Sequence, residues 1–469
     1  MHSPNPESPR PSTPLSFTMA SMLALLVSAY GSSPASDPAP AAAATAGNWH
    51  HWRGPSGNGV SPDANPPLSW SPSKGVVWKV PIPGRGSASP VVWGDRIFVS
   101  TAAPAVAAAR EEKGAGGAPE EGEREKGKGK GKDRSDDLAP HRFIILAIDR
   151  ATGKTLWERV AIEATPAEGH HPDHGFASAS PFTDGERVYA HFGSRGLFAF
   201  TMEGEPVWSR TDFGAMTTRN TFGEGSSPAI HRDVIVVPWD QEGPSWLMAI
   251  DKRTGKTIWK KDRDETSSWG TPLVVDHAGK SQVITTGEKF ARGHDLATGE
   301  ELWRCTGQTG RPIASPVASH GIAIVGSGFR GSYLGAFRLD ARGDLKGTDG
   351  VAWSLSKHTP DVPSPLLSGK RVYFHAGRGG ILSCHDVVSG KAHYSAQRVE
   401  GLGNVYASPV GAAGRIYLTA RDGVTVAIAD GDELKVLATS SVGEPVDATP
   451  ALAGKDVFIR GEKHLFAIQ

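Results

Sequence analysis

The chain has 469 residues, and glycine (57) and proline (35) together make up about a fifth of them. Lysine plus arginine (50) equals aspartate plus glutamate (50), so the formal net charge is zero. That balance gives no electrostatic reason to expect nucleic acid or an anionic membrane as the partner. The glycine and proline content is typical of many short strands joined by tight turns and argues against a mainly helical protein.

The N-terminal 32 residues have the features of an export signal. Arg10 precedes an apolar stretch from Leu15 to Val27, and mostly small residues occupy 28–32. This order is typical of a secretory signal peptide, and the apolar stretch is short for a transmembrane helix. We therefore expect a periplasmic or secreted protein with no transmembrane segment in the mature chain, residues 33–47 being a flexible linker. The alternative is an unstructured leader on a cytosolic protein.

One sequence pattern recurs from residue 80 to the end of the chain. A Ser-Pro or Thr-Pro pair opens each unit, alternating apolar strands follow, and the unit ends near an aspartate, a Thr-Gly-Lys turn and a tryptophan. Units of roughly 40–50 residues with several strands each predict the blades of a β-propeller. The eight opening pairs are Ser89-Pro90, Ser180-Pro181, Ser227-Pro228, Thr271-Pro272, Ser315-Pro316, Ser364-Pro365, Ser408-Pro409 and Thr449-Pro450.

The first unit contains a low-complexity insertion at 104–141. An acidic run at 120–125 is followed by alternating lysine and glycine at 126–132. Mixed charge with few apolar residues cannot form a core. We expect a disordered, solvated loop within blade 1, between strands that contain Phe98 and Phe143.

The outer strand of each unit carries a large aromatic residue. A flat side chain there can wedge between neighbouring blades and bury about 150–250 Å². We interpret these residues as structural, because a row that stacks on a ligand would have to face the channel. They are Trp157, Trp208, Trp259, Trp303, Trp353 and, in the sixth unit, Tyr394.

The eighth unit reaches Gln469 without an outer strand, while residues 75–80 near the start form an outer strand without a blade. We predict that this segment completes the eighth blade and closes the ring, which removes an exposed sheet edge. The predicted fold is therefore all-β, an eight-bladed propeller of four-stranded antiparallel blades over residues 48–469. We expect a monomer.

The tandem Asp-x-x-Thr-Gly-Lys-x-x-Trp units resemble the quinoprotein-type propeller repeat. Further segments are similar to exported bacterial proteins called pyrroloquinoline-quinone (PQQ)-binding-like propeller proteins, and the resemblance extends from Trp49 to Gln469. These proteins look like the outer-membrane assembly factor BamB in fold. Since most have no demonstrated activity, the resemblance implies a fold more than a cofactor. The matching segments are 49–55, 218–220, 225–228, 262–265, 268–272, 436–439 and 448–451.

The family's quinone enzymes hold their cofactor over a tryptophan, with calcium bound by carboxylate and amide oxygens, under a disulfide of adjacent cysteines. This chain has only Cys305 and Cys384. They fall in the fourth and sixth units, too far apart for disulfide geometry, and we interpret them as buried free thiols. We therefore assign no catalytic residue and no cofactor, and PQQ belongs only to the alternative of a PQQ- or metal-dependent oxidoreductase.

The densest run of metal-ligand types is His170-His171-Pro172-Asp173-His174. It precedes the inner strand of the second unit, which places it on a loop at the channel mouth. Histidine and aspartate suit zinc or copper, but no second cluster accompanies them. A solvated loop is the preferred interpretation, and the alternative metal site would use His170, His171 and His174.

Two segments that precede neighbouring inner strands combine charged and aromatic residues. Loops on a rigid scaffold favour binding sites, so we expect these segments to form a binding face at the funnel. Its candidate residues are Arg219, Asn220, Glu224, Asp262, Glu265 and Trp269. The alternative is a salt-bridge network between blades 3 and 4, in which Arg219 or Arg263 pairs with the carboxylates.

The function expected from the sequence is an exported, non-catalytic propeller that serves as a binding scaffold in the cell envelope. Its partner would be an envelope protein or a small-molecule ligand. The alternatives are the oxidoreductase named above and a BamB-like outer-membrane protein assembly factor.

Overall fold

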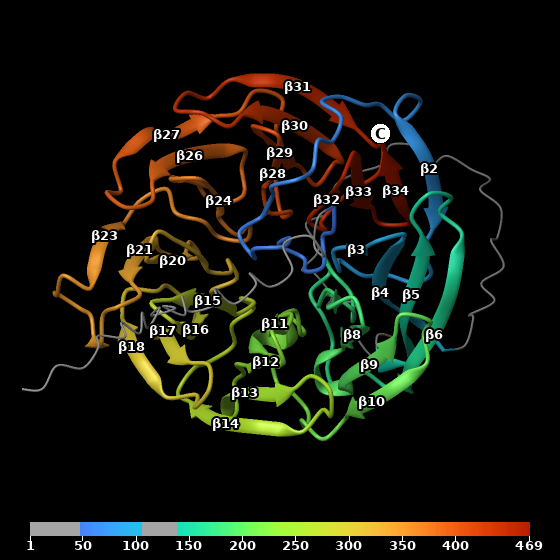
Figure 1. Ribbon diagram of the computed structural model, residues 1–469, viewed down its shortest axis with the longest axis horizontal. Coiled ribbons are helices and arrows are strands. Elements are labelled where there is room, and N and C mark those ends of the chain that lie inside the picture. The colour runs from blue at the N-terminus through green and yellow to red at the C-terminus, as the bar shows by residue number, and fades with distance from the viewer. Residues whose placement is uncertain (1–46, 106–137) are drawn as a thin grey trace, which may run out of the picture. The chain divides into compact units, whose positions relative to one another are not determined.

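The computed structural model describes residues 47–105 and 138–469, which form eight antiparallel sheets arranged as the blades of a ring (Figure 1). The predicted all-β, eight-bladed propeller is confirmed. The predicted signal peptide, nearly all of the linker and most of the insertion lie outside the described residues. Within the described part, no helix has the length and apolarity needed to cross a membrane.

Seven blades take their four strands from consecutive sequence, running from the channel outward. Blade 1 has β3 (Val91–Trp93), β4 (Arg96–Pro104), β5 (His141–Asp149) and β6 (Thr155–Ala164); blade 2 has β7 (Phe182–Thr183), β8 (Arg187–His191), β9 (Leu197–Thr201) and β10 (Pro206–Arg210); blade 3 has β11 (Ala229–His231), β12 (Val234–Trp239), β13 (Ser245–Asp251) and β14 (Thr257–Arg263). Blade 4 has β15 (Leu273–His277), β16 (Lys280–Thr285), β17 (Ala291–Asp295) and β18 (Glu301–Cys305); blade 5 has β19 (Val317–Ser319), β20 (Ile322–Ser327), β21 (Tyr333–Arg338) and β23 (Val351–Leu355). Blade 6 has β24 (Leu366–Ser368), β25 (Arg371–His375), β26 (Ile381–Asp386) and β27 (Ala392–Arg398); blade 7 has β28 (Val410–Ala412), β29 (Arg415–Thr419), β30 (Val424–Ala429) and β31 (Val436–Ser441).

Blade 8 is assembled from both ends of the sequence. Its inner three strands are β32 (Ala451–Ala453), β33 (Asp456–Arg460) and β34 (His464–Ile468), and its outer strand is β2 (Val76–Pro81). β2 runs antiparallel to β34, with Val76 opposite Ile468 and Pro81 opposite His464. Two short parallel strands extend other blades: β1 (Val60–Ser61) lies beside β28, and β22 (Gly343–Asp344) lies beside β18.

The eight opening Ser-Pro and Thr-Pro pairs form a closed circle of hydrogen bonds around the channel. In each blade the backbone N–H of the serine or threonine donates to the hydroxyl of the corresponding residue in the next blade, and Thr449 closes the circle onto Ser89; the eight distances are 2.9–3.2 Å. Because a residue before proline is held extended, its N–H is directed in the same way in every blade. We call this circle the hydroxyl ring: Ser89, Ser180, Ser227, Thr271, Ser315, Ser364, Ser408 and Thr449.

Five outer-strand tryptophans each join their blade to the next, as expected of a structural role, whereas the Trp303 indole N–H donates to the Gln282 side chain of its own blade at 3.2 Å. The Trp208 indole N–H donates to the Lys252 carbonyl at 3.0 Å, in the turn of the following blade. The same ring covers Gly255, where a Cβ would lie 2.8 Å from Trp208 and φ is +70°. The turn therefore needs glycine for two reasons, backbone conformation and close approach. Trp78, Trp157, Trp259 and Trp353 donate to the following blade in the same manner.

One end of the channel is closed by residues 48–65, which we call the N-terminal plug. In Figure 1 this blue segment crosses the middle of the ring before it reaches β2. Its backbone bonds to blade 1 through Trp49 and Val92, to blade 6 through the Asn58 carbonyl and the Leu367 N–H (3.1 Å), and to blade 8 through the Asn65 N–H. The plug thus ties separate blades to one segment.

Arg53 is the centre of the plug. Its side chain is 2% exposed and donates to the carbonyls of Pro409 (2.8 Å) in blade 7 and Pro365 in blade 6. Burial without a carboxylate partner lowers the pKa of Arg53 to about 9. The neighbouring Trp52 faces the channel and forms part of the floor of the cavity described below.

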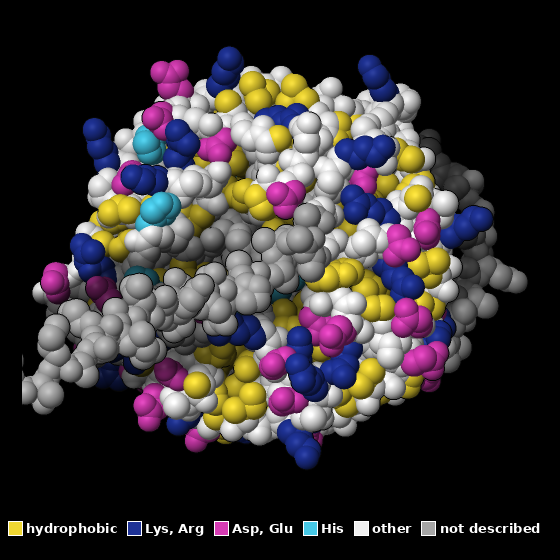
Figure 2. Space-filling view, in the orientation of Figure 1, with side chains coloured by type: hydrophobic (Ala, Val, Ile, Leu, Met, Phe, Trp, Pro, Cys, Tyr) yellow, Lys and Arg dark blue, Asp and Glu magenta, His cyan; other side chains and the backbone are white. Residues whose placement is uncertain are grey.

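The two cysteines and the surface charges agree with the sequence composition. Cys305 and Cys384 are both buried and unbonded, which confirms the prediction of free thiols. Acidic and basic side chains are interspersed over the face shown in Figure 2.

Candidate binding site at the channel mouth

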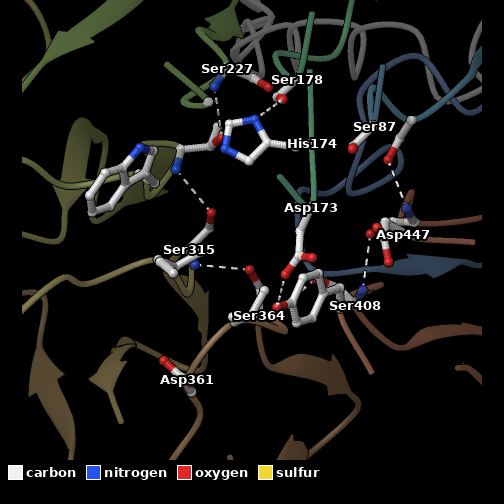
Figure 3. A pocket seen from close by; sticks show the side chains of 18 of the residues that line it. Ser87, Asp173, His174, Ser178, Ser227, Ser315, Asp361, Ser364, Ser408 and Asp447 are labelled. Atoms are coloured by element: carbon white, nitrogen blue, oxygen red, sulfur yellow. Dashed lines mark hydrogen bonds between the residues drawn. The ribbon is translucent and has the colours of Figure 1, made fainter. Parts of the chain in front are cut away.

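A cavity of about 260 Å³ lies on the channel axis, next to the plug, whose Trp52 is one of its lining residues. All eight blades contribute to its lining, and every member of the hydroxyl ring is among the lining residues. Figure 3 shows Ser227, Ser315, Ser364 and Ser408 surrounding this space. Since Trp52 closes it from the plug side, the cavity is a funnel with a floor.

A second ring of side chains lies above the hydroxyl ring. Side chains two positions apart on an extended chain point the same way, so the residue two before each opening serine or threonine also faces the axis. We call these eight residues the variable ring, because their chemistry varies around the channel. All of them line the cavity: Ser87, Ser178, Gly225, Trp269, Ile313, Val362, Tyr406 and Asp447.

One side of the cavity wall is polar. Asp173, on the loop before β7, accepts a hydrogen bond from the Tyr406 hydroxyl of blade 7 at 2.7 Å and lies 3.4 Å from Arg421. Burial opposes ionisation of Asp173, but Tyr406 and Arg421 outweigh it and lower the pKa of that carboxyl. Arg421 also pairs with Asp447 at 2.7 Å. The loop before β7 is thereby held across the mouth to blades 7 and 8.

Arg378 completes this polar side. Its Nε atom pairs with Asp361 at 2.7 Å, and its Nη1 atom donates to the Tyr406 hydroxyl at 3.0 Å. Each of the three aspartates at the mouth therefore contacts an arginine.

The other side of the wall is aromatic and contains Arg311. The Arg311 guanidinium carbon lies 3.2 Å from the ring centroid of Phe329 and 5.2 Å from that of Phe222. Among the described residues, the Arg311 side chain makes no hydrogen bond and no ion pair. Burial lowers the pKa of Arg311, and the positive charges of Arg378 and Arg330 lower it further.

Of the six residues predicted for the binding face, Trp269 lines the cavity. Its indole N–H donates to the Gly223 carbonyl at 2.7 Å, and its ring lies 6.4 Å from that of Phe222. The interaction fixes Trp269 as a wall of the funnel.

Two more of the six, Arg219 and Glu265, belong to polar networks outside the cavity. Arg219 pairs with Glu242 at 3.2 Å and with Glu288 at 2.9 Å, linking the loops of blades 3 and 4. Buried Glu265 accepts a hydrogen bond from the Lys289 backbone N–H at 2.8 Å and pairs with Arg292. These contacts form a salt-bridge network between blades 3 and 4, as in the alternative interpretation, but Arg219 pairs with Glu242 and Glu288 instead of the candidate carboxylates. Arg263 adds a buried pair with Asp240 at 2.8 Å.

Glu224 is half-buried and is not among the residues that line the cavity. Its carboxylate accepts hydrogen bonds from the backbone N–H (2.5 Å) and the hydroxyl of Ser194, in the short 3-10 turn η2 (Gly193–Arg195). Burial raises the pKa of Glu224 to about 7. Asn220 lies in the exposed turn η3 (Arg219–Thr221) with φ of +57°, and Asp262 is exposed on β14.

The histidine run is divided between two environments. His171 and His174 line the cavity, whereas His170 packs edge-on against Phe176 at 4.6 Å. His174 contacts the Ser178 hydroxyl at 3.2 Å, and burial lowers its pKa. Within residues 47–105 and 138–469, no group of three or more histidine, cysteine, aspartate or glutamate side chains is placed to hold a metal ion.

The donor set for a calcium–quinone site does not fit this cavity. Asp173, Asp361 and Asp447 are committed to arginines rather than grouped around a common point. The two thiols lie on β18 and β26, away from the cavity lining.

Several residues that line the cavity were not predicted from the sequence, among them Arg311, Phe329, Arg378 and Tyr406. Tyr406 and Asp447 had a signal in the sequence, since they occupy the same repeat position as Trp269. Arg311 and Arg378 had none, because their loops have different lengths and no shared pattern.

Comparison with known proteins places the chain in a family. The family model described as outer membrane protein assembly factor BamB matches residues 142–243 and 243–469, more than two thirds of the sequence. The chain therefore belongs to this family of PQQ-type β-propellers. No curated protein sequence matches it significantly.

Solved structures share the fold at low sequence identity. BamB from Moraxella catarrhalis is 12% identical with a TM-score of 0.52, covering 84% of this chain and 97% of that protein. Quinohemoprotein alcohol dehydrogenase from Comamonas testosteroni is 11% identical with a TM-score of 0.57, covering 90% of this chain and 80% of that one. The computationally designed Ika8 protein is 14% identical with a TM-score of 0.52, covering 71% of this chain and 93% of that one. At these identities the likeness establishes the propeller fold alone.

Proposed function

We propose that the protein is an exported, non-catalytic scaffold that acts as a monomer in the periplasm or outside the cell and binds a small ligand at the mouth of its channel. The observation that carries the proposal is the pairing of two rings. The hydroxyl ring has a serine or threonine in every blade and links each blade to the next. The variable ring above it ranges from glycine and serine to isoleucine, valine, aspartate, tyrosine and tryptophan around one space of about 260 Å³.

The ion pairs at the mouth support a non-catalytic role. The three aspartates at the mouth are engaged by Arg378 or Arg421. A general base has to reach the proton that it removes, and these carboxylates already contact guanidinium groups. The quinone-dependent alternative has the further difficulty that its calcium donor set is missing from the cavity.

A second candidate is a role in outer-membrane protein assembly with an envelope protein as partner. The family's description favours it. Such a role would be served by exposed apolar side chains on the loops. Among the described residues, most of the exposed large apolar side chains lie on outer strands and not on loops. They are Val77, Leu156, Val160, Val207, Ile258 and Val436. The ligand-binding role is therefore the first proposal.

The test is a substitution that fills the cavity without breaking a hydrogen bond. Val362→Trp adds a bulky side chain to the variable ring in blade 6. Val388→Trp is the matched control, since Val388 is an exposed residue of the same blade. Both variants and the unmodified mature chain are screened by ligand-observed NMR against small carboxylates, amines, sugars and dipeptides. Their unfolding midpoints are measured alongside.

The expected result is that at least one compound binds the unmodified chain and V388W equally but binds V362W at least about tenfold more weakly, since a filled site loses most of its contacts. Binding that V362W leaves unchanged would contradict the location of the site. If no compound binds, and envelope proteins co-purify with V362W as well as with the unmodified chain, the assembly role replaces this proposal. A spectral change on adding PQQ with calcium would favour the oxidoreductase.

A further inference from the structure

The charged side chains at the mouth are paired, with one exception. Arg378 contacts Asp361, and Arg421 contacts both Asp447 and Asp173. Arg311 lines the same cavity, yet no carboxylate lies within ion-pair distance of it among the described residues. A half-buried guanidinium normally finds acceptors, because its five N–H donors lose water on burial.

The surroundings of Arg311 disfavour its positive charge. Burial lowers its pKa, and Arg378, Arg330 and Arg219 act in the same direction, while only Asp361 opposes them. The contacts that Arg311 does make are with the phenyl rings of Phe222 and Phe329. Such rings attract a cation, but they do not satisfy its N–H donors. An anion in the cavity would do so.

The hydroxyl ring is a second, independent reason to expect a ligand with hydrogen-bond acceptors. Each of its eight oxygens accepts a backbone N–H from the preceding blade, and none of its hydroxyl groups donates to an acceptor among the described residues. A hydroxyl that already accepts a hydrogen bond is polarised toward donating one. The floor of the cavity therefore offers donors and favours a ligand that supplies acceptors.

The shape and charge of the cavity limit what this ligand can be. Phe222, Phe329, Trp269 and Tyr406 give it aromatic walls, and its volume is about 260 Å³. Asp173, Asp361 and Asp447 are already paired with Arg378 or Arg421. The single positive charge of Arg311 is left without a partner, and it favours a ligand with one negative charge over a ligand with several.

We propose that the cavity, in the ligand-binding role proposed above, selects a small aromatic monocarboxylate whose carboxylate pairs with Arg311. The planar guanidinium matches a carboxylate through two parallel hydrogen bonds. The aromatic body of the ligand lies between the phenyl and indole walls. The hydroxyl ring supplies further donors below it.

Three probes and two variants test this assignment on the mature chain. Benzoate is the monocarboxylate, benzamide is its neutral equivalent, and benzene-1,3,5-tricarboxylate is the polyanion. Arg311→Gln removes the charge. Arg330→Gln is the matched control, since Arg330 also lies against Phe329, at 5.3 Å, but does not line the cavity. Ligand-observed NMR titrations give the affinities, and thermal unfolding confirms that both variants fold.

The expected result is that benzoate binds more tightly than benzamide and than the tricarboxylate. R311Q should weaken benzoate binding by about 10- to 100-fold, the effect of losing a hydrogen-bonded charge, and should leave benzamide binding unchanged. R330Q should bind benzoate like the unmodified chain.

Other outcomes overturn the assignment in distinguishable ways. If benzamide binds as tightly as benzoate, or R330Q weakens benzoate as much as R311Q does, the carboxylate is not recognised by Arg311, although the binding role stands. If the tricarboxylate binds best, the preference for a single charge is wrong. If none of the three probes binds, but other compounds bind the unmodified chain and bind V362W more weakly, the assignment of an aromatic monocarboxylate is wrong and the binding role stands. If nothing binds at all, the binding role fails as well.

Discussion

The two ends of the channel each place an arginine near the axis, and the two arginines differ in what surrounds them. Arg53, in the plug, is fully buried and donates to backbone carbonyls of blades 6 and 7. Arg311, at the mouth, is half-buried against two phenyl rings and has no acceptor among the described residues. A guanidinium whose acceptors belong to the protein stabilises the fold. One without such acceptors is available to a ligand.

Removal of the sealed end should have the largest effect. We compare residues 47–469 with residues 81–469, which lack the plug and β2. The shorter chain loses the outer strand of blade 8 and the contacts that join separate blades. It should therefore lose cooperative unfolding, as followed by circular dichroism and calorimetry. An unchanged melting midpoint would show that neither segment closes the ring.

Single substitutions of the two arginines should separate their roles. Arg53→Met leaves the Pro365 and Pro409 carbonyls without their buried donor, which should lower the free energy of unfolding by about 2–5 kcal/mol. Arg311→Gln should lower it by less than about 1 kcal/mol, as is usual away from buried networks. Urea unfolding measures both. Equal losses would mean that Arg311 is structural too.

A fall in pH below 6.5 should lower the stability of the protein through a histidine at the sealed end, and a rise in pH from 4.5 to 7 should lower it through a glutamate near the mouth. At the sealed end, burial lowers the pKa of His51 to about 3, and the nearby His50 and Arg53 contribute. Below pH 6.5 His51 is protonated in the unfolded chain but stays neutral in the folded chain, so stability falls as the pH falls. Near the mouth, burial raises the pKa of Glu224 to about 7. Between pH 4.5 and 7 the folded chain binds more protons than the unfolded chain, so stability falls as the pH rises.

The measurement is the free energy of unfolding in urea at pH 4, 6 and 8. His51→Gln should remove a loss of up to about 3 kcal/mol between pH 6.5 and pH 4, and Glu224→Gln should remove one of similar size between pH 4.5 and pH 7. If a variant and the unmodified chain have the same dependence of the unfolding free energy on pH, the substituted residue does not cause that dependence.

The fold was predictable because its determinants are local and repeated. The Ser-Pro pairs gave the number of blades, and the glycine turns with their tryptophans gave the inner and outer strands. The hydroxyl ring is formed by the same pairs but could not be predicted, because hydrogen bonds between residues 41 or more positions apart have no signature within one unit. The plug could not be predicted for the same reason. Nothing in the sequence around Arg53 indicates that its side chain binds backbone carbonyls in blades 6 and 7.

The site was predictable only where it follows the repeat. Trp269 was found through its charged neighbours, although Arg219 pairs with Glu242 and Glu288, and Glu265 pairs with Arg292, instead of facing the cavity. Tyr406 and Asp447 share its repeat position and were within reach of the same reasoning. Arg311 is set by a loop whose length and conformation, with φ of +55°, no pattern in the sequence specifies.

The spacing of the two rings has a consequence for engineering. The hydrogen bonds that hold the blades together use the backbone and hydroxyl of one residue, while the side chain that faces the ligand sits two positions earlier. Ile313 and Val362 can therefore be exchanged for other side chains without changing any bond of the hydroxyl ring. The propeller is a scaffold on which new specificities could be selected from a library that randomises only such positions.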